Sequence, residues 1–310
     1  MTDSRAFCWP RGVMTALVTP LHDDALDIDA LKRVIDRQVQ DGVAGLVVAG
    51  GTGEYGTLSL EEREQLAVES VRLAAGRLPV ILQTGALATR DAIRLSVHAQ
   101  EIGADAIMVA SPYGEAISWP ERLRFYEQLT AQVSLSVMVY NTPPSGLLTF
   151  EQALALLELP HIDAIKDSSG SPELMGDLVT WAAEPGRDLA VYVGLDSLLY
   201  DAVATGAHGA VFGAANLIPA PLGAVARSVR EDGPTPESRD LWRPIRAMLR
   251  AMEVSPNYVS LCKAGMELVG IEVGDARPPY LMPETWETER LAGLLEAVEQ
   301  AYAASPLRAR

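Results

Sequence analysis

Lysine is rare in this sequence, and one of its three lysines stands where an amine could do covalent chemistry. Lys166 closes an apolar run that begins at His161, and the polar residues 167–170 follow it directly. Twenty-two of the 25 basic residues are arginines, so the need for a surface cation does not explain a lysine here. Unlike arginine, lysine can lose its proton when it is desolvated and can then attack a carbonyl. The position of Lys166 therefore predicts a nucleophilic amine.

Two other features of the sequence could complete such a reaction. An amine of this kind forms a Schiff base with a keto acid, and the iminium withdraws electrons from a neighbouring carbon–carbon bond. The reaction needs a proton shuttle, and Tyr140 offers a phenol for that role. It also needs a cradle for the substrate carboxylate. The Gly50–Gly53 turn offers backbone N–H groups free of side chains, and the Thr52 hydroxyl adds a donor.

Each of these three features has a purely structural interpretation when it is taken alone. A lysine at the end of a strand is often a paired cation, a tyrosine there is often a core aromatic, and a glycine-rich run is often only a tight turn. The chemical interpretation depends on the three features meeting in space. The fold has to bring the ends of separate strands together for that to happen.

The chain alternates short apolar runs with longer amphipathic stretches, the pattern of strands followed by helices. The runs show little polar alternation, which is typical of strands buried on both faces. Eight runs before residue 214 favour a closed α/β fold, the (β/α)8 TIM barrel. An open sheet would more often carry a Gly-rich dinucleotide loop, and the sequence has none. The predicted strands are Val13–Val18, Gly45–Ala49, Val80–Gln83, Ala106–Ala110, Ser136–Tyr140, Asp163–Lys166, Ala190–Val193 and Gly209–Phe212. The predicted helices include Ile28–Gln40, Leu60–Ala75, Thr89–Ile102, Pro120–Gln132 and Phe150–Leu157, with Asp27 and Ser59 as the first two N-caps.

The alternation stops after Phe212, and the remaining chain reads as helices separated by Pro- and Gly-containing breaks at 232–234 and 276–279. We therefore expect residues 1–214 to form a catalytic barrel with a short N-terminal arm, and residues 215–310 to form a C-terminal helical extension. Lys263 lies in a helical pattern of this extension, and we interpret it as structural. Active sites of such barrels lie in the loops after the C-terminal ends of the strands. Lys166, Tyr140 and the Gly50–Gly53 turn should meet there.

The overall composition narrows the range of partners. A net charge of −16 argues against nucleic acid and against an anionic membrane, because both require a basic face. Two cysteines at unrelated positions and four histidines without ligand spacing predict neither a disulfide framework nor a metal site. The N-terminal segment lacks the apolar stretch of a signal peptide, and no apolar run approaches membrane length, so we expect a cytoplasmic protein.

Four motifs give the chain a family resemblance from about Gly12 to its C-terminus. They are GGTGE at 50–54, YNTP at 140–143, IKDSSG at 165–170 and GAHGAVFGAAN at 206–216. In combination they resemble the dihydrodipicolinate synthase / N-acetylneuraminate lyase family of pyruvate-dependent class I aldolases. The resemblance implies homotetramers or homodimers of barrels that bind a small keto acid. It also implies that no metal or organic cofactor is used, because the substrate is held as a covalent imine.

The same resemblance assigns roles to individual residues. It makes Lys166 the Schiff-base lysine and Tyr140 the proton donor and acceptor, with Thr52 as the third catalytic residue. The substrate-binding residues that it implies are Gly51, Thr52, Val211 and Tyr113.

Several departures from the family pattern bear on the substrate. Gly51 replaces a Thr or Ser that relays protons, and Gly114 stands where the lysine-pathway synthase has a tyrosine that reaches across its dimer. No arginine follows the 140–143 motif to bind a second carboxylate, and the pair at 196–197 is Asp-Ser where the sialic acid lyase has Asp-Glu. We therefore expect a Schiff-base-forming lyase that acts on pyruvate or a 2-keto acid. Its reaction would be reversible aldol cleavage or condensation, or dehydration of a 2-keto-3-deoxy sugar acid. The alternatives are a 4-hydroxy-tetrahydrodipicolinate synthase and a catalytically decayed barrel that serves as a keto-acid-binding or regulatory protein.

Overall fold

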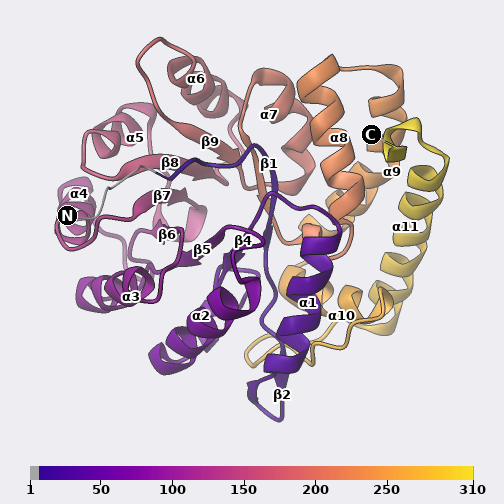
Figure 1. Ribbon diagram of the computed structural model, residues 1–310, viewed down its shortest axis with the longest axis horizontal. Helices are drawn as coiled ribbons and strands as arrows, with labels where there is room; N and C mark the ends of the chain where they lie inside the picture. Colours follow the sequence, from indigo (N-terminus) through magenta and orange to yellow (C-terminus); the bar gives the residue numbers. More distant parts are fainter. Residues whose placement is uncertain (1–6, 310) are drawn as a thin grey trace.

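The computed structural model describes residues 7–309, and within them eight parallel strands close into a barrel. Helices surround the barrel, and further C-terminal helices lie along one side of it (Figure 1). The first strand, β1, pairs with β10 on one side and with β4 on the other, which closes the ring. The predicted (β/α)8 fold is therefore confirmed. The barrel strands are β1 (Gly12–Ala16), β4 (Gly45–Val48), β5 (Val80–Gln83), β6 (Ala106–Ala110), β7 (Ser136–Asn141), β8 (Ile162–Asp167), β9 (Ala190–Val193) and β10 (Gly209–Phe212).

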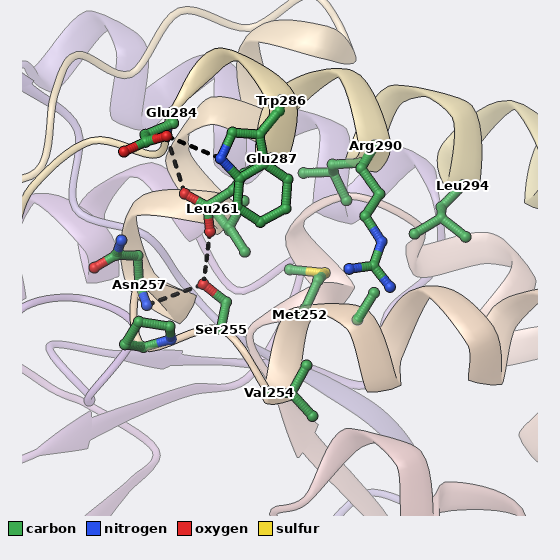
Figure 2. A pocket seen from close by; sticks show the side chains of 13 residues that line it. Met252, Val254, Ser255, Asn257, Leu261, Glu284, Trp286, Glu287, Arg290 and Leu294 are labelled. Carbon is green, nitrogen blue, oxygen red and sulfur yellow. Dashed lines mark hydrogen bonds between the residues drawn. The ribbon is translucent and has the colours of Figure 1, made fainter.

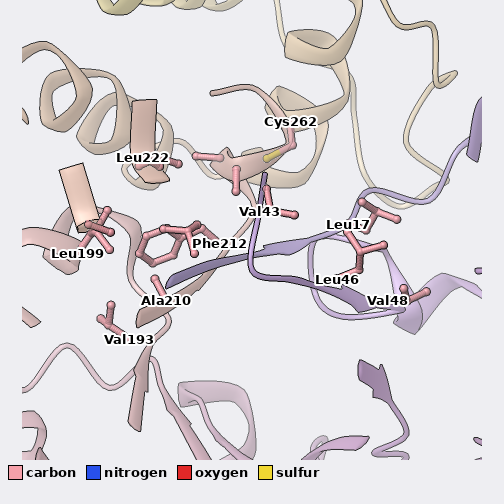
Figure 3. Packing of buried hydrophobic residues seen from close by; sticks show 14 of the residues in the cluster. Leu17, Val43, Leu46, Val48, Val193, Leu199, Ala210, Phe212, Leu222 and Cys262 are labelled. Carbon is pink, nitrogen blue, oxygen red and sulfur yellow. The ribbon is translucent and has the colours of Figure 1, made fainter. Parts of the chain in front are cut away.

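The barrel strands are almost wholly buried, and alternate residues along a strand belong to different layers of the core. In β6, Ala106 and Met108 belong to the cluster inside the barrel, whereas Ile107 and Val109 belong to the cluster between strands and helices. Figure 3 shows part of this outer cluster, including Phe212 of β10. Because apolar side chains cover both faces of the sheet, the strands read in the sequence as continuous apolar runs.

The helices begin where the sequence provides caps. The Asp27 carboxylate accepts a hydrogen bond from the Ala30 N–H at 2.8 Å, and Ser59 and Glu62 form a reciprocal capping box. Both predicted N-caps are confirmed. The helices that follow the barrel strands are α1 (Ile28–Gln40), α2 (Leu60–Ala74), α3 (Thr89–Glu101), α4 (Trp119–Thr130), α5 (Phe150–Leu157), α6 (Pro172–Ala182), α7 (Leu199–Thr205) and α8 (Pro219–Asp232).

The segment after the first strand differs from the predicted elements. Strand β1 ends at Ala16, two residues before the predicted end, because the Val18 N–H donates to the side chain of Asn216 at 3.2 Å and not to a neighbouring strand. A small antiparallel hairpin of β2 (Leu21–His22) and β3 (Ala25–Leu26) then follows, which no sequence pattern predicted. Its two turn residues have positive φ, the geometry of a tight hairpin.

The rest of the described chain is helical. It contains α9 (Pro236–Glu253), α10 (Tyr258–Leu268) and α11 (Thr285–Ala304), and α9 and α11 pack together at one side of the barrel (Figure 1). The predicted breaks fall at the end of α8 and in the segment 269–284 between α10 and α11. Helix α8, which follows residue 214, packs against β1. The division of the chain into a barrel and an extension at residue 214 stays a prediction. Within residues 7–309, no helix has the length and apolar character that a membrane crossing requires.

Short 3-10 turns shape the C-terminal ends of four barrel strands. Chain segments that carry candidate site residues lie at or beside these turns, so the turns help to set the direction of those side chains. The turns are η1 (Tyr55–Thr57) after β4, η2 (Pro143–Ser145) after β7, η3 (Asp196–Leu198) after β9 and η4 (Ala214–Asn216) after β10, while η5 (Pro306–Ala309) follows α11.

Candidate active site

Lys166 and Tyr140 lie side by side at the C-terminal ends of β8 and β7. The two residues are register partners in the parallel pair, and the Lys166 Nζ lies 4.2 Å from the centre of the Tyr140 ring. This distance is within the range of a cation–π contact. Only 6% of Lys166 is exposed. The barrel therefore brings together the amine and the phenol that the sequence singled out.

The residues that follow this pair hold the two strand ends in register. The Asn141 side-chain amide donates to the Asp167 carboxylate at 2.7 Å, and the Ser169 hydroxyl donates to the same carboxylate at 2.8 Å. Both Asn141 and Asp167 are buried, so these hydrogen bonds form away from competing water. The amine and the phenol are thus carried on a rigid edge of the barrel.

The environment of Tyr140 makes its phenol more acidic than an ordinary tyrosine. Burial by itself would raise the pKa of the phenol, but the positive charge of Lys166 and the nearby Thr142 hydroxyl outweigh burial and lower this pKa below its usual value. A phenol with a lowered pKa gives up and regains a proton more readily near neutral pH. Tyr140 therefore has the electrostatic setting of a proton shuttle.

Because Gly194, directly after β9, has no side chain, Lys166 has room beside it. A Cβ atom at this position would lie 2.7 Å from Lys166 Cε and 2.1 Å from Ser168 Oγ, closer than real Cβ contacts. The Ser168 hydroxyl is buried, and its interaction with the Tyr140 phenol helps to lower the pKa of Tyr140. Ser168 therefore lies beside both the amine and the phenol. Sequence reasoning did not select Ser168 as a site residue, although it lies in the IKDSSG motif.

The predicted carboxylate cradle forms a tight turn after β4. Thr52 is 8% exposed. A Cβ atom at Gly213 would lie 2.8 Å from Thr52 Oγ1, so the Thr52 hydroxyl packs against the end of β10. Gly51 is exposed, and a Cβ atom there would meet nothing within 4 Å. The glycine at position 51 therefore leaves open space beside the turn.

Val211 and Tyr113 occupy two different parts of the site region. Val211, on β10, is buried in the cluster inside the barrel, to which Tyr140 also packs. The Tyr113 ring makes an edge-to-face contact with Tyr55, with ring centres 5.5 Å apart. Burial raises the pKa of Tyr55, and the neighbouring phenols of Tyr113 and Tyr140 raise it further. Three tyrosines thus lie near one another, and Tyr55 is one that sequence reasoning missed.

Asp196 and Tyr258 form a hydrogen-bonded pair at the same end of the barrel. The Tyr258 hydroxyl, from α10, donates to Asp196 Oδ2 at 2.5 Å, and the Ala214 N–H donates to both groups at 3.0 and 3.2 Å. A Cβ atom at Gly213 would lie 2.7 Å from the Tyr258 hydroxyl oxygen, so Tyr258 and the Thr52 hydroxyl flank the same glycine.

The Asp196 carboxyl group holds its proton more tightly than an ordinary aspartate. Burial raises the pKa of Asp196 to about 7. The hydrogen bond from Tyr258 opposes this rise, and the charge of Glu253 adds to it. Sequence reasoning placed Asp196 only at a strand end and did not select Tyr258, because no motif links α10 to the barrel loops.

A separate pocket of about 340 Å³ lies among α9, α10 and α11 (Figure 2). Met252, Val254 and Leu294 form apolar parts of its wall, and Trp286 and Arg290 lie at its side. None of the predicted site residues lines it. Within residues 7–309 no cluster of three or more His, Cys, Asp or Glu side chains could hold a metal ion.

The chain is similar to known proteins along most of its length. The chain matches the model of the dihydrodipicolinate synthetase family over residues 9–298. It is 32% identical to a 4-hydroxy-tetrahydrodipicolinate synthase of Bacillus velezensis over 283 residues, which cover 90% of this chain and 96% of the relative. It is 34% identical to the enzyme of the same name from Exiguobacterium sibiricum over 277 residues, which cover 87% of this chain and 92% of the relative.

Solved structures of related proteins share the whole fold. The 4-hydroxy-tetrahydrodipicolinate synthase of Methylacidiphilum fumariolicum superposes with a TM-score of 0.88 at 29% identity, covering 94% of this chain and 97% of the other. YagE, a prophage protein from E. coli K12 solved in complex with pyruvate, superposes with a TM-score of 0.88 at 26% identity, covering 93% and 98%. This chain therefore belongs to the dihydrodipicolinate synthetase family.

Proposed function

We propose that this protein is a class I aldolase or lyase that forms a Schiff base between Lys166 and pyruvate or a related 2-keto acid. The observation that carries the proposal is the position of the Lys166 Nζ, 4.2 Å from the centre of the Tyr140 ring on the neighbouring strand. A nucleophilic amine beside a phenol that can donate and accept a proton is the arrangement that imine chemistry needs. Family membership and the pyruvate bound to YagE support the keto-acid class of substrate.

The reaction begins when the unprotonated Lys166 amine attacks the C2 carbonyl of the keto acid. Tyr140 donates a proton to the resulting carbinolamine hydroxyl, water leaves, and a C=N bond forms in its place. When the bond between C3 and C4 then breaks, its electron pair moves toward the iminium nitrogen and gives an enamine, while the C4 fragment leaves as an aldehyde. Tyr140 accepts the proton of the C4 hydroxyl, whose oxygen becomes the carbonyl oxygen of the aldehyde. The reverse sequence joins an aldehyde to the enamine.

The turn at Gly51 and Thr52 holds the carboxylate of the keto acid in this proposal. Backbone N–H groups at a glycine turn approach an anion closely, and the Thr52 hydroxyl supplies a further donor. Val211 lines the space for the small methyl or methylene end of the substrate, and Tyr113 closes the outer side. The imine on Lys166 takes the place of a metal or organic cofactor.

The second part of the substrate is best accounted for by a 2-keto-3-deoxy sugar acid, which the enzyme cleaves or dehydrates. The loop after β7 supplies no arginine. The nearby Arg122 guanidinium already donates hydrogen bonds to the carbonyls of Ser145 and Gly146 in this loop, at 2.9 and 3.0 Å. A second carboxylate therefore lacks a cationic partner in this loop. The open space at Gly51 leaves room for an extended chain.

The other candidate activity is 4-hydroxy-tetrahydrodipicolinate synthesis, which the names of the curated relatives favour. A barrel that binds keto acids without turnover is a third candidate, since Gly51 lacks the hydroxyl that relays protons in other members. A panel of small aldehydes with pyruvate, and of 2-keto-3-deoxy sugar acids alone, separates the three. Cleavage or dehydration of a sugar acid supports the leading proposal, and condensation with an amino-acid aldehyde supports the synthase. Turnover of neither class supports the binding protein.

Trapping with pyruvate and borohydride tests the shared first step. We expect one reduced pyruvyl adduct per chain, mapped to Lys166 by peptide mass spectrometry, and no adduct in Lys166→Ala. Lys32→Ala is the matched control, because Lys32 is an exposed lysine that pairs with Asp36 on α1. An adduct that persists in Lys166→Ala would overturn the proposal.

The proposal extends to partners and location. The protein acts on a small keto acid as a homotetramer or homodimer in the cytoplasm, and it binds neither nucleic acid nor membrane. The net charge of −16 supports the last two points, because both surfaces are anionic. Light scattering on a size-exclusion column gives the oligomer size directly, and a monomer at micromolar concentration would contradict the proposed assembly.

A further inference from the structure

A buried ion pair connects the turn after β4 to α10. The Lys263 Nζ lies 2.6 Å from Glu54 Oε1, and the side chains of both residues are 0% exposed. Lys263 also donates to the Asp275 carbonyl at 2.8 Å. Removing two charges from water is costly, and the mutual attraction offsets that cost only when the geometry is well defined. Lys263, interpreted from the sequence as structural, therefore has a specific partner next to the candidate carboxylate cradle.

Glu54 ends the turn that contains Gly51 and Thr52. Its backbone is left-handed, with φ 57° and ψ 31°, and its N–H donates to the Gly51 carbonyl at 3.0 Å. A non-glycine residue keeps this conformation only when its surroundings hold it. The ion pair with Lys263 does so on one carboxylate oxygen, and the Arg277 N–H donates to the other at 2.8 Å. The conformation of the turn thus depends on groups in the C-terminal part of the chain.

Gly53, which lies between Thr52 and Glu54, is closely packed against the segment after β1. A Cβ atom at Gly53 would lie 3.0 Å from the Leu17 carbonyl oxygen and 3.2 Å from Thr19 Oγ1. The Thr19 hydroxyl in turn donates to the Gly53 carbonyl at 2.7 Å. A shift of Glu54 is therefore passed on to the peptide groups of Gly51 and Thr52 and is not absorbed between them.

We propose that Glu54 and Lys263 are positioning residues that hold the N–H groups of Gly51 and Thr52 in the geometry that binds the substrate carboxylate. The inference rests on the proposed function, because it assigns the carboxylate of the keto acid to this turn. The pair does not touch the reacting atoms at Lys166. It therefore sets the affinity for pyruvate and leaves the chemical step at Lys166 unchanged.

Three variants test this inference: Glu54→Gln, Lys263→Met and the double variant that combines them. Each single variant leaves one buried group without its partner, whereas the double variant buries no unpaired charge. Lys32→Met, which removes an exposed lysine, is the control. Borohydride trapping is measured as a function of pyruvate concentration, which gives a half-saturating concentration and a maximal trapping rate. Thermal unfolding is measured on the same samples.

A positioning role predicts that the half-saturating pyruvate concentration rises roughly tenfold in the variants, as when a partner that orients a binding group is removed. The maximal trapping rate stays within about twofold of the wild type. In the double variant, thermal stability recovers but the half-saturating concentration stays high, because the turn is no longer held. If affinity recovers together with stability in the double variant, the pair is only structural and the inference is wrong.

The controls separate this inference from the proposed function. If the wild type itself gives no pyruvyl adduct, the proposed function fails. If the wild type is trapped and every variant saturates at the same pyruvate concentration, only the positioning role fails. Should the single variants not fold, the double variant alone decides between a raised and an unchanged half-saturating concentration.

Discussion

The Tyr258 hydroxyl donates a hydrogen bond of 2.5 Å to the carboxylate of Asp196, which joins α10 to the end of the seventh barrel strand. Because the same hydroxyl accepts from the Ala214 N–H at 3.0 Å, it also reaches the end of the eighth strand. A helix outside the strand–helix alternation thus contacts two loops at the C-terminal ends of the barrel strands. Asp196 is a buried acid, and burial raises its pKa into a range where its titration can be measured.

Asp196 should make stability fall as pH rises toward neutrality. Burial raises the pKa of Asp196 from 3.8 to about 7 in the folded protein, so between these values the unfolded chain has released a proton that the folded chain retains. The contribution of this group to stability is therefore complete below pH 3.8 and is lost as pH rises to about 7. Asp196→Asn should lose this slope when Tm is measured from pH 4 to 7.5. Parallel Tm curves for variant and wild type would show that Asp196 does not titrate in this range.

Tyr258→Phe should move the same titration upward. The phenol's hydrogen bond favours the ionised carboxylate and lowers the pKa of Asp196, so its removal raises that pKa further. The difference in Tm between the wild type and Asp196→Asn stops changing at a certain pH. The difference between Tyr258→Phe and the double variant Tyr258→Phe/Asp196→Asn should stop changing at a higher pH. An unchanged or lower value would mean that Tyr258 does not act on the carboxyl group.

Tyr140→Phe should separate the binding of the keto acid from its chemistry. The ring contact with Lys166 is kept, but the proton shuttle is lost, so turnover should fall by roughly 100- to 10,000-fold. The variant should unfold within a few degrees of the wild type, because only a hydroxyl is removed. Rapid-quench trapping with pyruvate should still label Lys166, at a lower rate. Turnover equal to that of the wild type would exclude Tyr140 as the relay.

Gly194→Ala should disable the site through one methyl group. The new Cβ would lie 2.7 Å from Lys166 Cε and 2.1 Å from Ser168 Oγ, so Lys166 has to leave its position beside Tyr140. We expect loss of pyruvate trapping at Lys166. Gly176→Ala is the matched control, because a Cβ atom there meets nothing within 4 Å and Gly176 lies within α6. That control should trap pyruvate normally and be more stable by up to about 1 kcal/mol.

Gly51→Thr should test whether the open space beside the turn is used by the substrate. A Cβ atom at position 51 meets nothing within 4 Å, so the variant should fold normally and still be trapped by pyruvate. If a sugar acid extends into this space, its KM should rise in the variant while pyruvate trapping is unchanged. A KM equal to that of the wild type for every sugar acid tested would place the extended substrate elsewhere.

Much of the barrel is determined by the sequence alone. The bounds of β5, β6, β9 and β10 agree with the prediction, because strands covered on both faces are almost wholly apolar and stand out as short apolar runs. The meeting of Lys166 and Tyr140 could also be predicted. Successive strands of such a barrel are neighbours and run in parallel, so residues at their C-terminal ends fall side by side.

Only the tertiary structure decided which distant residues pair beside the candidate site. Asp196 pairs with Tyr258 and Glu54 pairs with Lys263, and in each pair one partner lies on α10. The periodicity of α10 shows that it is a helix, but it does not show where the helix packs. That depends on contacts such as the one between Gly265 and Leu217, where a Cβ atom would lie 2.6 Å from the leucine side chain. Hydrophobic patterns report burial and not the identity of the neighbour, so pairs between remote segments are readable only once the chain has folded.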